Sequence, residues 1–424
     1  MDKLKTNANR LIREFKGDRY IFGCGCFPRL GKMASLLGRK ALLVSNLHTR
    51  DSNSFCVMKK TLSEAGVTII GHTQSARPNS PMEDILQIRN IIRLSMPDFV
   101  ISASGGSGID AAKAAIALTA LDGDLEDYFG TNRITEKLSK KGGRLLPHLA
   151  VQTASGSAAH LTKYSNVTNL ETQQKKLIVD EAIIPPLSLF DYSLTKTMSP
   201  EFTCDGAFDG LSHCLEVYFG AKPDRIDVIE EVALSGMECI ISSLERAVRN
   251  PDDMEAREAL GLGTDLGGYC VMLGGTNGAH LNSFSLVDIL SHGRACAILN
   301  PYYTVLFAAA IPRQLHKTGV LLAEYGLINS QHLDCKGREL GIIVAGGLIS
   351  LAKKVGFPAT LQDVQGITSR HLEKALEAAK NPQLSMKLMN MPVPMTADQV
   401  DDYMGPVLKA AFTGDFDLIR PFEL

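Results

Sequence analysis

The stretch Asp98-Phe-Val-Ile-Ser-Ala-Ser-Gly-Gly-Ser-Gly-Ile-Asp-Ala-Ala-Lys113 decides the fold of the first half of the chain. It reads as an apolar strand that leads through a Gly-rich turn into an Ala-rich helix. Backbone N–H groups in such a turn can approach a phosphate, and the helix N-terminus adds partial positive charge. Glycines also serve plain strand-to-helix turns, where they supply positive φ angles. The context favours the phosphate-binding interpretation, with Gly105, Gly106 and Ser107 as the cradle.

The segments around this turn alternate between strand and helix patterns. Lys40–Ser45 is a continuous apolar run, which is typical of a strand covered on both faces of a parallel sheet. Further strands are predicted at residues 20–26 and 67–70, and helices at 29–37, 54–65 and 81–95. This alternation predicts a doubly wound, Rossmann-like α/β domain with a parallel sheet.

From Tyr192 onward the apolar spacing changes to helical periods. Candidate helices cover residues 204–219, 227–249, 254–273, 294–309, 317–325, 336–355, 368–380 and 397–412. A chain of 424 residues is also too long for one ordinary core. We therefore predict a dinucleotide-binding α/β domain over residues 1–191 and an all-α domain over 192–424, with a ligand-binding cleft between them.

The composition excludes several partner classes. A net charge of -2 gives no reason to expect nucleic acid or an anionic membrane surface. Nine cysteines without a CxxC pair indicate a reducing compartment. Residues 1–16 lack the apolar core of a signal peptide, and no apolar run reaches the roughly 18 residues of a membrane span. The sequence predicts a cytoplasmic protein.

Asp209 and His213 lie four residues apart within a helical pattern, so both side chains should project from one helix face. Such a pair can grip one divalent cation, or it can form a weak pair on a solvated face. His280 and His292 follow in an apolar, Gly-rich region that is low in charge. Their position favours the metal interpretation.

Three segments resemble motifs of the iron-containing (group III) alcohol dehydrogenases, which have a dehydroquinate synthase-like fold. Ser104–Lys113 resembles the GGGSxxDxAK signature, Asp205–Tyr218 resembles the DALTHAIEAY helix, and Ser291–Pro301 resembles PHGxANAxLLP. The resemblance extends over the whole chain. It implies that the metal ligands are Asp209, His213, His280 and His292, with Asp209, His280 and His292 also assigned to catalysis. One carboxylate oxygen and three imidazoles suit Fe(II) or Zn(II) and leave a position open for substrate.

The chain departs from the family pattern after His280. The family normally has HxxxHxLG, whereas Phe284 stands here in place of the second histidine. A neutral histidine held by hydrogen bonds in the cleft wall is the alternative role for His280. The missing histidine leaves the proton route open between His160, Asp288 and a water chain through the cofactor ribose.

The resemblance also implies a nicotinamide cofactor. Gln152–Thr162 resembles PTTAGTGSEVT, with His160 in place of the usual glutamate, and Lys176 competes with Lys175 as a cofactor contact. Asn46 stands where NAD-preferring members often have Asp, so the cofactor is predicted to be NAD or NADP. The predicted contacts are Asn46, Gly105, Gly106, Ser107, Asp110, Thr153, Ser157, Thr162 and Lys175.

The function that the resemblance implies is a metal-dependent NAD(P) alcohol dehydrogenase or aldehyde reductase. Hydride would pass between nicotinamide C4 and the carbon of a metal-bound alcohol or carbonyl. The partners would be a small alcohol or aldehyde and further copies of the chain, in a homodimer or larger homo-oligomer. Two alternatives on the same fold are a glycerol dehydrogenase-like polyol dehydrogenase and a dehydroquinate synthase-like lyase. A third is a non-catalytic nucleotide-binding homologue, which the missing second histidine would favour.

Overall fold

The structure is a computed structural model that describes residues 2–121 and 123–422. Its contacts divide the chain into two compact units, which we call the sheet unit and the helical unit. The sheet unit comprises residues 12–198 and 251–261, and the helical unit comprises the described residues of 1–11, 199–250 and 262–424. The main boundary falls between Met198 and Ser199. The predicted boundary after Asp191 stays a prediction.

The sheet unit contains a six-stranded parallel sheet in the order β1-β9-β6-β4-β2-β3. This confirms the predicted parallel α/β fold. The strands are β1 (Tyr20–Gly23), β2 (Lys40–Ser45), β3 (Thr68–Thr73), β4 (Phe99–Ser104), β6 (His148–Gln152) and β9 (Leu187–Asp191).

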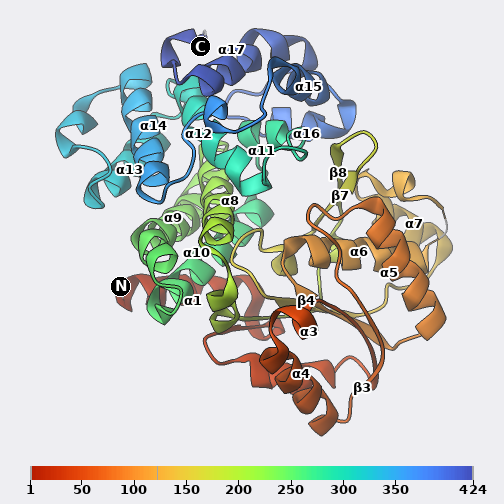
Figure 1. Cartoon of the computed structure of the whole chain (residues 1–424). Helices are drawn as coiled ribbons and strands as arrows, with labels where there is room; N and C mark the ends of the chain where they lie inside the picture. The colour runs from red at the N-terminus through yellow and green to blue at the C-terminus, as the bar shows by residue number, and fades with distance from the viewer. Residues whose placement is uncertain (1, 122, 423–424) are drawn as a thin grey trace. The chain divides into compact units, whose positions relative to one another are not determined.

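Alternate residues of the central strands supply two separate apolar cores, one on each face of the sheet. Leu42 and Val44 of β2 pack with α5 (Met82–Ser95) and α6 (Gly106–Ala120). Ala41 and Leu43 pack in the other core, to which α2 (Leu30–Ala34) and α4 (Ser52–Glu64) contribute. Figure 1 shows α5 and α6 on the opposite side of the sheet from α4. Coverage on both faces explains why the strand reads as an unbroken apolar run.

A second, three-stranded sheet in the order β5-β8-β7 was not predicted. Its strands are β5 (Gly130–Thr131), β7 (Tyr164–Asn169) and β8 (Gln174–Val179), and β7 pairs with β8 antiparallel. The helix α7 (Arg133–Lys141) and the short helix α3 (Leu47–Arg50) complete the sheet unit. The hairpin positions Lys175 opposite Thr168.

The helical unit confirms the predicted helical second half. No helix in the described part of the chain is long and apolar enough to cross a membrane. Two helices belong to it only in part: α1 (Asp2–Lys16) begins there, and α10 (Met254–Leu273) enters it after Gly261. Its other helices are α8 (Pro200–Phe219), α9 (Ile226–Arg249), α11 (Gly278–Ser283), α12 (His292–Phe307), α13 (Pro312–Glu324), α14 (Gly337–Lys354), α15 (Ser369–Ala379), α16 (Ser385–Met389) and α17 (Val400–Thr413).

Candidate metal centre and nucleotide-binding turn

Helix α8 presents the first two candidate ligands, Asp209 and His213, from one face. The helix begins at Pro200, after Ser199 accepts a hydrogen bond from the Phe202 N–H at 3.2 Å. A Ser cap followed by Pro at the first helical position is a stable helix start. Both candidate ligands are buried within the helical unit. Burial of an Asp and a His together argues against the solvated surface pair considered from the sequence.

The other two candidate ligands, His280 and His292, lie on α11 and α12. His280 lies within the short helix α11, and His292 is the first residue of α12. Gly293 explains how α12 reaches α8, because a Cβ atom at this position would lie 1.9 Å from the Asp205 carbonyl oxygen. Only glycine permits so close an approach of the two backbones. The approach brings His292 beside Asp209.

The four predicted ligands meet at one oxygen atom. Asp209 Oδ1 lies 3.6 Å from His213 Nε2, 3.7 Å from His280 Nε2 and 3.6 Å from His292 Nε2. These separations exceed those of hydrogen bonds. Four donors bound to one ion at about 2.1 Å in a tetrahedron would lie about 3.4 Å apart. The three distances to Asp209 therefore fit one cation, and the donor atoms of Asp209, His280 and His292 also lie within 4.8 Å of one another.

Two hydrogen bonds fix which imidazole nitrogens face Asp209. Ser283 donates its only hydroxyl proton to the His280 carbonyl at 2.7 Å, so it must accept from His292 Nδ1 at 2.9 Å. His280 Nδ1 lies 2.6 Å from Glu216 Oε1, to which it donates. Both histidines therefore use Nδ1 for these hydrogen bonds and turn Nε2, the nitrogen left for a metal, toward Asp209. A cation between Asp209 Oδ1 and these nitrogens would satisfy all of them together.

The buried atoms at this point support the same conclusion. Among the described residues, Asp209 Oδ1 and His280 Nε2 are buried without a hydrogen-bond partner. Buried polar atoms are rarely left so, because an unsatisfied group costs about 1–3 kcal/mol. A bound ion would satisfy both atoms. The residues present thus fit a divalent metal ion.

The electrostatics keep two of the candidate ligands, Asp209 and His213, in their metal-binding forms. Burial opposes ionisation of Asp209, but His213, His292 and His280 outweigh it and hold the carboxyl pKa well below its usual range. Burial lowers the pKa of His213 to about 4, although Asp209 opposes this shift. At neutral pH the site therefore offers a carboxylate and a neutral imidazole, which are the forms that bind metals.

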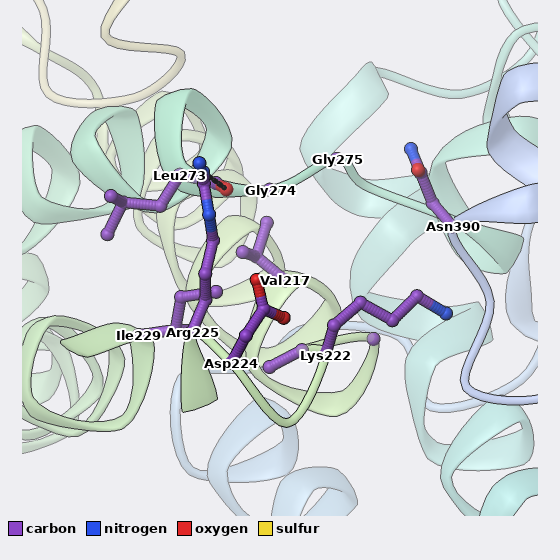
Figure 2. A pocket seen from close by; sticks show the side chains of 11 residues that line it. Val217, Lys222, Asp224, Arg225, Ile229, Leu273, Gly274, Gly275 and Asn390 are labelled. Carbon is purple, nitrogen blue, oxygen red and sulfur yellow. Dashed lines mark hydrogen bonds between the residues drawn. The ribbon is translucent and has the colours of Figure 1, made fainter. Parts of the chain in front are cut away.

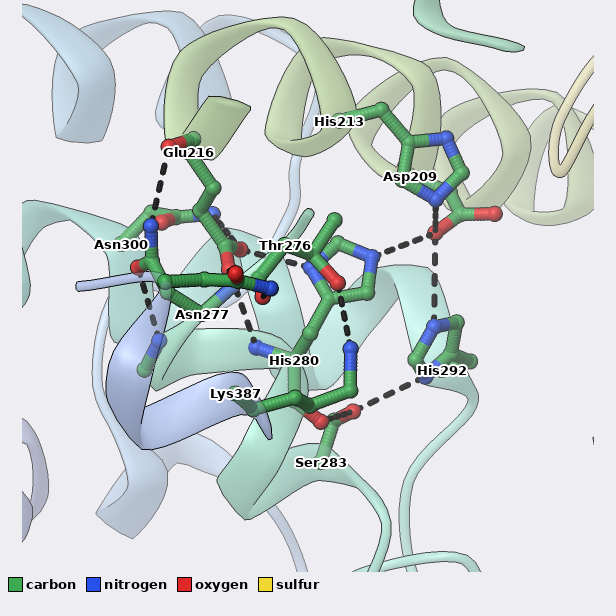
Figure 3. A network of polar contacts seen from close by, with 12 residues as sticks. Asp209, His213, Glu216, Thr276, Asn277, His280, Ser283, His292, Asn300 and Lys387 are labelled. Carbon is green, nitrogen blue, oxygen red and sulfur yellow. Dashed lines mark hydrogen bonds and ion pairs between the residues drawn. The ribbon is translucent and has the colours of Figure 1, made fainter. Parts of the chain in front are cut away.

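A buried polar network supports His280 from behind (Figure 3). Besides His280 Nδ1, Glu216 accepts the Asn277 N–H at 2.8 Å and the Asn300 side-chain amide at 3.2 Å. Lys387 donates to the hydroxyl of Thr276 within the same group of residues and lies 5.1 Å from the Phe284 ring centroid. A carboxylate behind a metal-binding histidine fixes its tautomer and ring orientation.

The Gly-rich turn has the geometry predicted for it. Helix α6 begins at Gly106, directly after β4, so its first N–H groups stand at the carboxyl end of the central strand. A Cβ atom at Gly106 would lie 2.2 Å from Ser157 Oγ. The two segments predicted to contact the cofactor are therefore neighbours in the sheet unit. The Thr153 N–H donates to the Ser104 carbonyl at 3.0 Å and joins them further.

Other predicted cofactor contacts have structural partners. The Ser107 hydroxyl accepts the Asn79 N–H at 3.0 Å. Asp110 is buried and accepts two hydrogen bonds from Asn166, at 3.0 and 2.9 Å. The Thr162 carbonyl accepts from the buried Lys113 at 2.8 Å. The bonds to Asn166 and Thr162 tie α6 to β7 and the segment just before it, and the bond from Asn79 ties α6 to the segment before α5.

The two lysines of β8 lie on opposite faces of the strand. Lys175 is buried. Burial raises the pKa of Asp110, and the charge of Lys175 offsets part of that rise. Lys176 instead forms an ion pair with Glu126 at 2.7 Å and lies 5.1 Å from the Phe129 ring centroid. The position of Lys176 is therefore explained by contacts within the protein, without a cofactor.

Asn46 stands at the carboxyl end of β2, where the ribose contact was predicted. Its Oδ1 accepts the Ser75 N–H at 3.1 Å, and its Nδ2 donates to the Ser75 carbonyl at 3.5 Å. The imidazole of His48 lies nearby on α3 and packs against His72 at 4.8 Å between ring centroids.

The candidate proton donors are held by other groups. His160 is buried in the sheet unit, and its Nε2 atom lies 3.0 Å from the Tyr20 hydroxyl oxygen. Asp288 lies in the helical unit and pairs with His371 at 3.7 Å and Lys374 at 3.8 Å. Neither contact assigns a proton route. Phe284, in place of the second histidine, is buried beside His292 at 5.8 Å between ring centroids.

A cavity of about 620 Å³ in the helical unit is lined in part by Ser291, which precedes His292 in the chain. Its guanidinium, from Arg294, lies 4.7 Å from the Phe357 ring centroid and 3.4 Å from Asp205. Lys353 and Asp363 line the same cavity, so two carboxylates balance its two cations. The cavity therefore lacks the excess positive charge that a phosphorylated substrate would require.

A smaller cavity of about 190 Å³ lies where α8 and α10 end (Figure 2). Lys222, Asp224 and Arg225 line it, and Arg225 donates to the Leu273 carbonyl at 3.1 Å. Basic groups near helix C-termini offset the partial negative charge there. This explains Arg225 as a cap at the end of α10.

Sequence reasoning did not single out Glu216, Ser283 or Cys296. Glu216 follows His213 within the same helical motif, which was the available signal. Cys296 follows His292 by four residues, the spacing that had identified Asp209 and His213. Its sulfur lies within 4.8 Å of donor atoms of Asp209, His280 and His292. Ser283 carried no sequence signal.

Comparison with known families matches both parts of the chain. Residues 17–192 match the family described as iron-containing alcohol dehydrogenase, and residues 203–406 match the C-terminal part of the Fe-containing alcohol dehydrogenase family. The NAD-dependent methanol dehydrogenase of Bacillus methanolicus is 26% identical over 309 residues, covering 72% of this chain and 78% of that protein. The 1,3-propanediol dehydrogenase of Klebsiella pneumoniae is 26% identical over 349 residues, covering 81% and 86%.

Solved structures share the fold. A 1,3-propanediol oxidoreductase superposes with a TM-score of 0.80 at 23% identity and covers 93% of this chain and 98% of its own. The NADH-dependent butanol dehydrogenase A of Thermotoga maritima gives a TM-score of 0.78 at 23% identity, with 93% and 97% covered. These likenesses agree with a parallel α/β part followed by a helical part.

Proposed function

Because the chain belongs to the iron-containing alcohol dehydrogenase family and is an NAD(P)-dependent alcohol dehydrogenase or reductase, we propose that Asp209, His213, His280 and His292 hold its divalent metal ion. The observation that carries this proposal is the convergence of three imidazole Nε2 atoms on Asp209 Oδ1 at 3.6–3.7 Å. An ion held there would supply a Lewis acid that makes an alcohol more acidic or a carbonyl more electrophilic.

The residues around the ligands would orient them and keep the site dry. Glu216 and Ser283 hold the imidazoles of His280 and His292 in one tautomer. Phe284 and Leu290 are buried, and their apolar side chains limit the access of water. Preorganised ligands in a dry site need little rearrangement during the reaction.

We further propose that the turn at Gly105, Gly106 and Ser107 binds the pyrophosphate of the nicotinamide cofactor. The first N–H groups of α6 and the helix dipole are suited to an anion. Thr153, Ser157, Thr162, Asp110 and Lys175 would line or support the remaining cofactor, as the family resemblance implies. Asn46 carries no charge to repel a 2′-phosphate, so we propose that the protein accepts both NAD and NADP.

The substrate class is an alcohol or aldehyde, as the family implies. We propose a small, uncharged molecule, because the Arg294 cation near the ligands is already paired with Asp205. We also propose a homodimer or larger homo-oligomer, which light scattering on the purified protein would test.

The proposed function is tested with metal-replete protein, NADH or NADPH, and a panel of short aldehydes. We expect loss of nicotinamide absorbance with at least one aldehyde and recovery in the reverse direction with the matching alcohol. Absence of cofactor oxidation with every aldehyde, in protein whose metal content has been measured, would refute it and favour the non-catalytic alternative.

A further inference from the structure

Cys296 lies inside the candidate metal centre, although nothing in the family motifs makes it a ligand. One donor atom from each of Asp209, His280, His292 and Cys296 lies within 4.8 Å of the others. Cys296 is fully buried. Four donors this close, with a sulfur among them, form a set that favours a transition metal.

The helix geometry repeats the arrangement that positions the first ligand pair. On α8, Asp209 and His213 are four residues apart; on α12, His292 and Cys296 have the same spacing. Side chains at this spacing lie one above the other on a single helix face. His292 points toward Asp209. Cys296 lies on the same side of α12, so its sulfur also points toward the cluster.

A second observation also indicates a ligand between these side chains. Among the described residues, His280 Nε2 is buried without a hydrogen-bond partner, and His280 is only 2% exposed. The opposite ring nitrogen already donates to Glu216. The Nε2 atom is therefore the ring nitrogen left to bind an ion on the side where Asp209 and Cys296 lie.

Position 296 is also where this chain departs from the family pattern. The motif PHGxANAxLLP has asparagine there, whereas the chain reads Ser-His-Gly-Arg-Ala-Cys-Ala-Ile-Leu-Asn-Pro. The other buried cysteines, Cys204, Cys214, Cys239 and Cys270, do not belong to a donor group within the described part of the chain. The exchange puts a soft donor among oxygen and nitrogen donors.

We propose that Cys296 Sγ binds the same ion as Asp209, His280 and His292, and that this thiolate biases the site toward zinc over iron. The proposal rests on the metal centre proposed above and adds a sulfur to its donors. On binding, the sulfur–metal bond forms, the thiol proton leaves to solvent and no electron is transferred. Thiolate ligands favour Zn(II) among the metals that the cluster could hold.

The first test is the absorption spectrum of the full-length protein loaded with Co(II). We expect a thiolate-to-cobalt charge-transfer band in the near ultraviolet, which Cys296→Ser removes while cobalt binding is retained. Cys214→Ser is the matched control, because Cys214 is a buried cysteine beside His213 but outside the donor group, and it should keep the band. Stoichiometric cobalt without the band, or a band that survives Cys296→Ser, would overturn the proposal.

A second measurement needs no variant. X-ray absorption at the zinc edge of the wild-type protein should require one sulfur scatterer at about 2.3 Å. A fit with only oxygen and nitrogen neighbours would overturn the proposal even if Cys296→Ser does not fold. If neither cobalt nor zinc binds, the proposed metal centre fails as well, so the two failures are distinguishable.

The selectivity is tested by competition. Wild-type protein and Cys296→Asn, which restores the family residue, are exposed anaerobically to equal concentrations of Fe(II) and Zn(II). We expect the bound zinc-to-iron ratio to fall about tenfold in Cys296→Asn, in the range of changes caused by altered ligand surroundings. An unchanged ratio would contradict the selectivity.

Discussion

Glu216 Oε1 lies 2.6 Å from Nδ1 of His280, and both residues are almost completely buried. The backbone N–H of Asn277 and the amide of Asn300 also donate to this carboxylate. The carboxylate therefore remains ionised in the interior because its oxygens are satisfied. It sets the tautomer that leaves His280 Nε2 available to a metal.

Glu216→Gln should weaken metal binding about 10–100-fold, because a neutral side chain accepts less strongly from His280 and presents an N–H toward a neighbouring donor. Metal affinity is measured by competition with a chelator of known affinity. Glu216→Asp keeps the charge on a shorter side chain and should recover part of the affinity. Equal affinities in all three proteins would show that Glu216 does not support the site.

Gly293→Ala should separate α12 from α8, since the added Cβ would meet the Asp205 carbonyl at 1.9 Å. We expect a loss of about 1–3 kcal/mol in stability and weaker metal binding. Gly346→Ala is the matched control, because Gly346 also lies in a helix and nothing lies within 4 Å of its added Cβ. The control should melt at the same or a higher temperature. If both variants melt and bind metal alike, the close approach of the two helices is not required.

Asn46→Asp should weaken NADPH relative to NADH, because a carboxylate repels a 2′-phosphate and accepts from a 2′-hydroxyl. The substitution keeps the Oδ1 that accepts the Ser75 N–H, so the local turn should be preserved. The ratio of kcat/KM for the two cofactors is the measurement. A ratio equal to that of the wild type would show that Asn46 does not face the ribose.

His148 should make the protein sensitive to acid. Burial lowers its pKa from 6.5 to about 3, and its Nε2 lies 2.7 Å from the Ser102 hydroxyl. Between these pH values the unfolded chain binds the proton and the folded protein does not. Stability is therefore complete above about pH 6.5 and falls as the pH drops toward 3, by up to about 1.4 kcal/mol per pH unit.

His148→Gln removes this titration. The melting temperature of the variant should therefore fall less steeply than that of the wild type between pH 6.5 and pH 4. Parallel pH profiles for the two proteins would be inconsistent with a buried neutral His148.

Much of the fold could be predicted because its signals are local. The strand Lys40–Ser45 and the helix Met254–Leu273 have the predicted bounds, since an unbroken apolar run and a long helical period are each contained within one element. The hairpin of β7 and β8 was missed, because its polar residues have no strong strand pattern and its stability comes from pairing and packing.

The candidate site likewise contains a part that the sequence predicted and a part that it could not. Asp209 and His213 are one helical turn apart, so their sequence spacing was informative. Glu216 supports His280 across a separation of 64 residues, and this contact depends on how α8 and α11 pack. The position of Ser283 between His280 and His292 likewise depends on the turn after α11. Such contacts follow from tertiary structure and have no local pattern.

The metal content of His292→Ala, measured beside that of the wild type after identical loading with Fe(II) or Zn(II), tests the central claim most directly. His292 Nε2 lies 3.6 Å from Asp209 Oδ1 and should be one of the ligands around the ion. We predict about one bound ion per chain in the wild type and little or none in the variant, with turnover lost in parallel and the fold retained by circular dichroism. A variant that binds the ion as tightly as the wild type, or that turns over substrate without metal, would contradict the account.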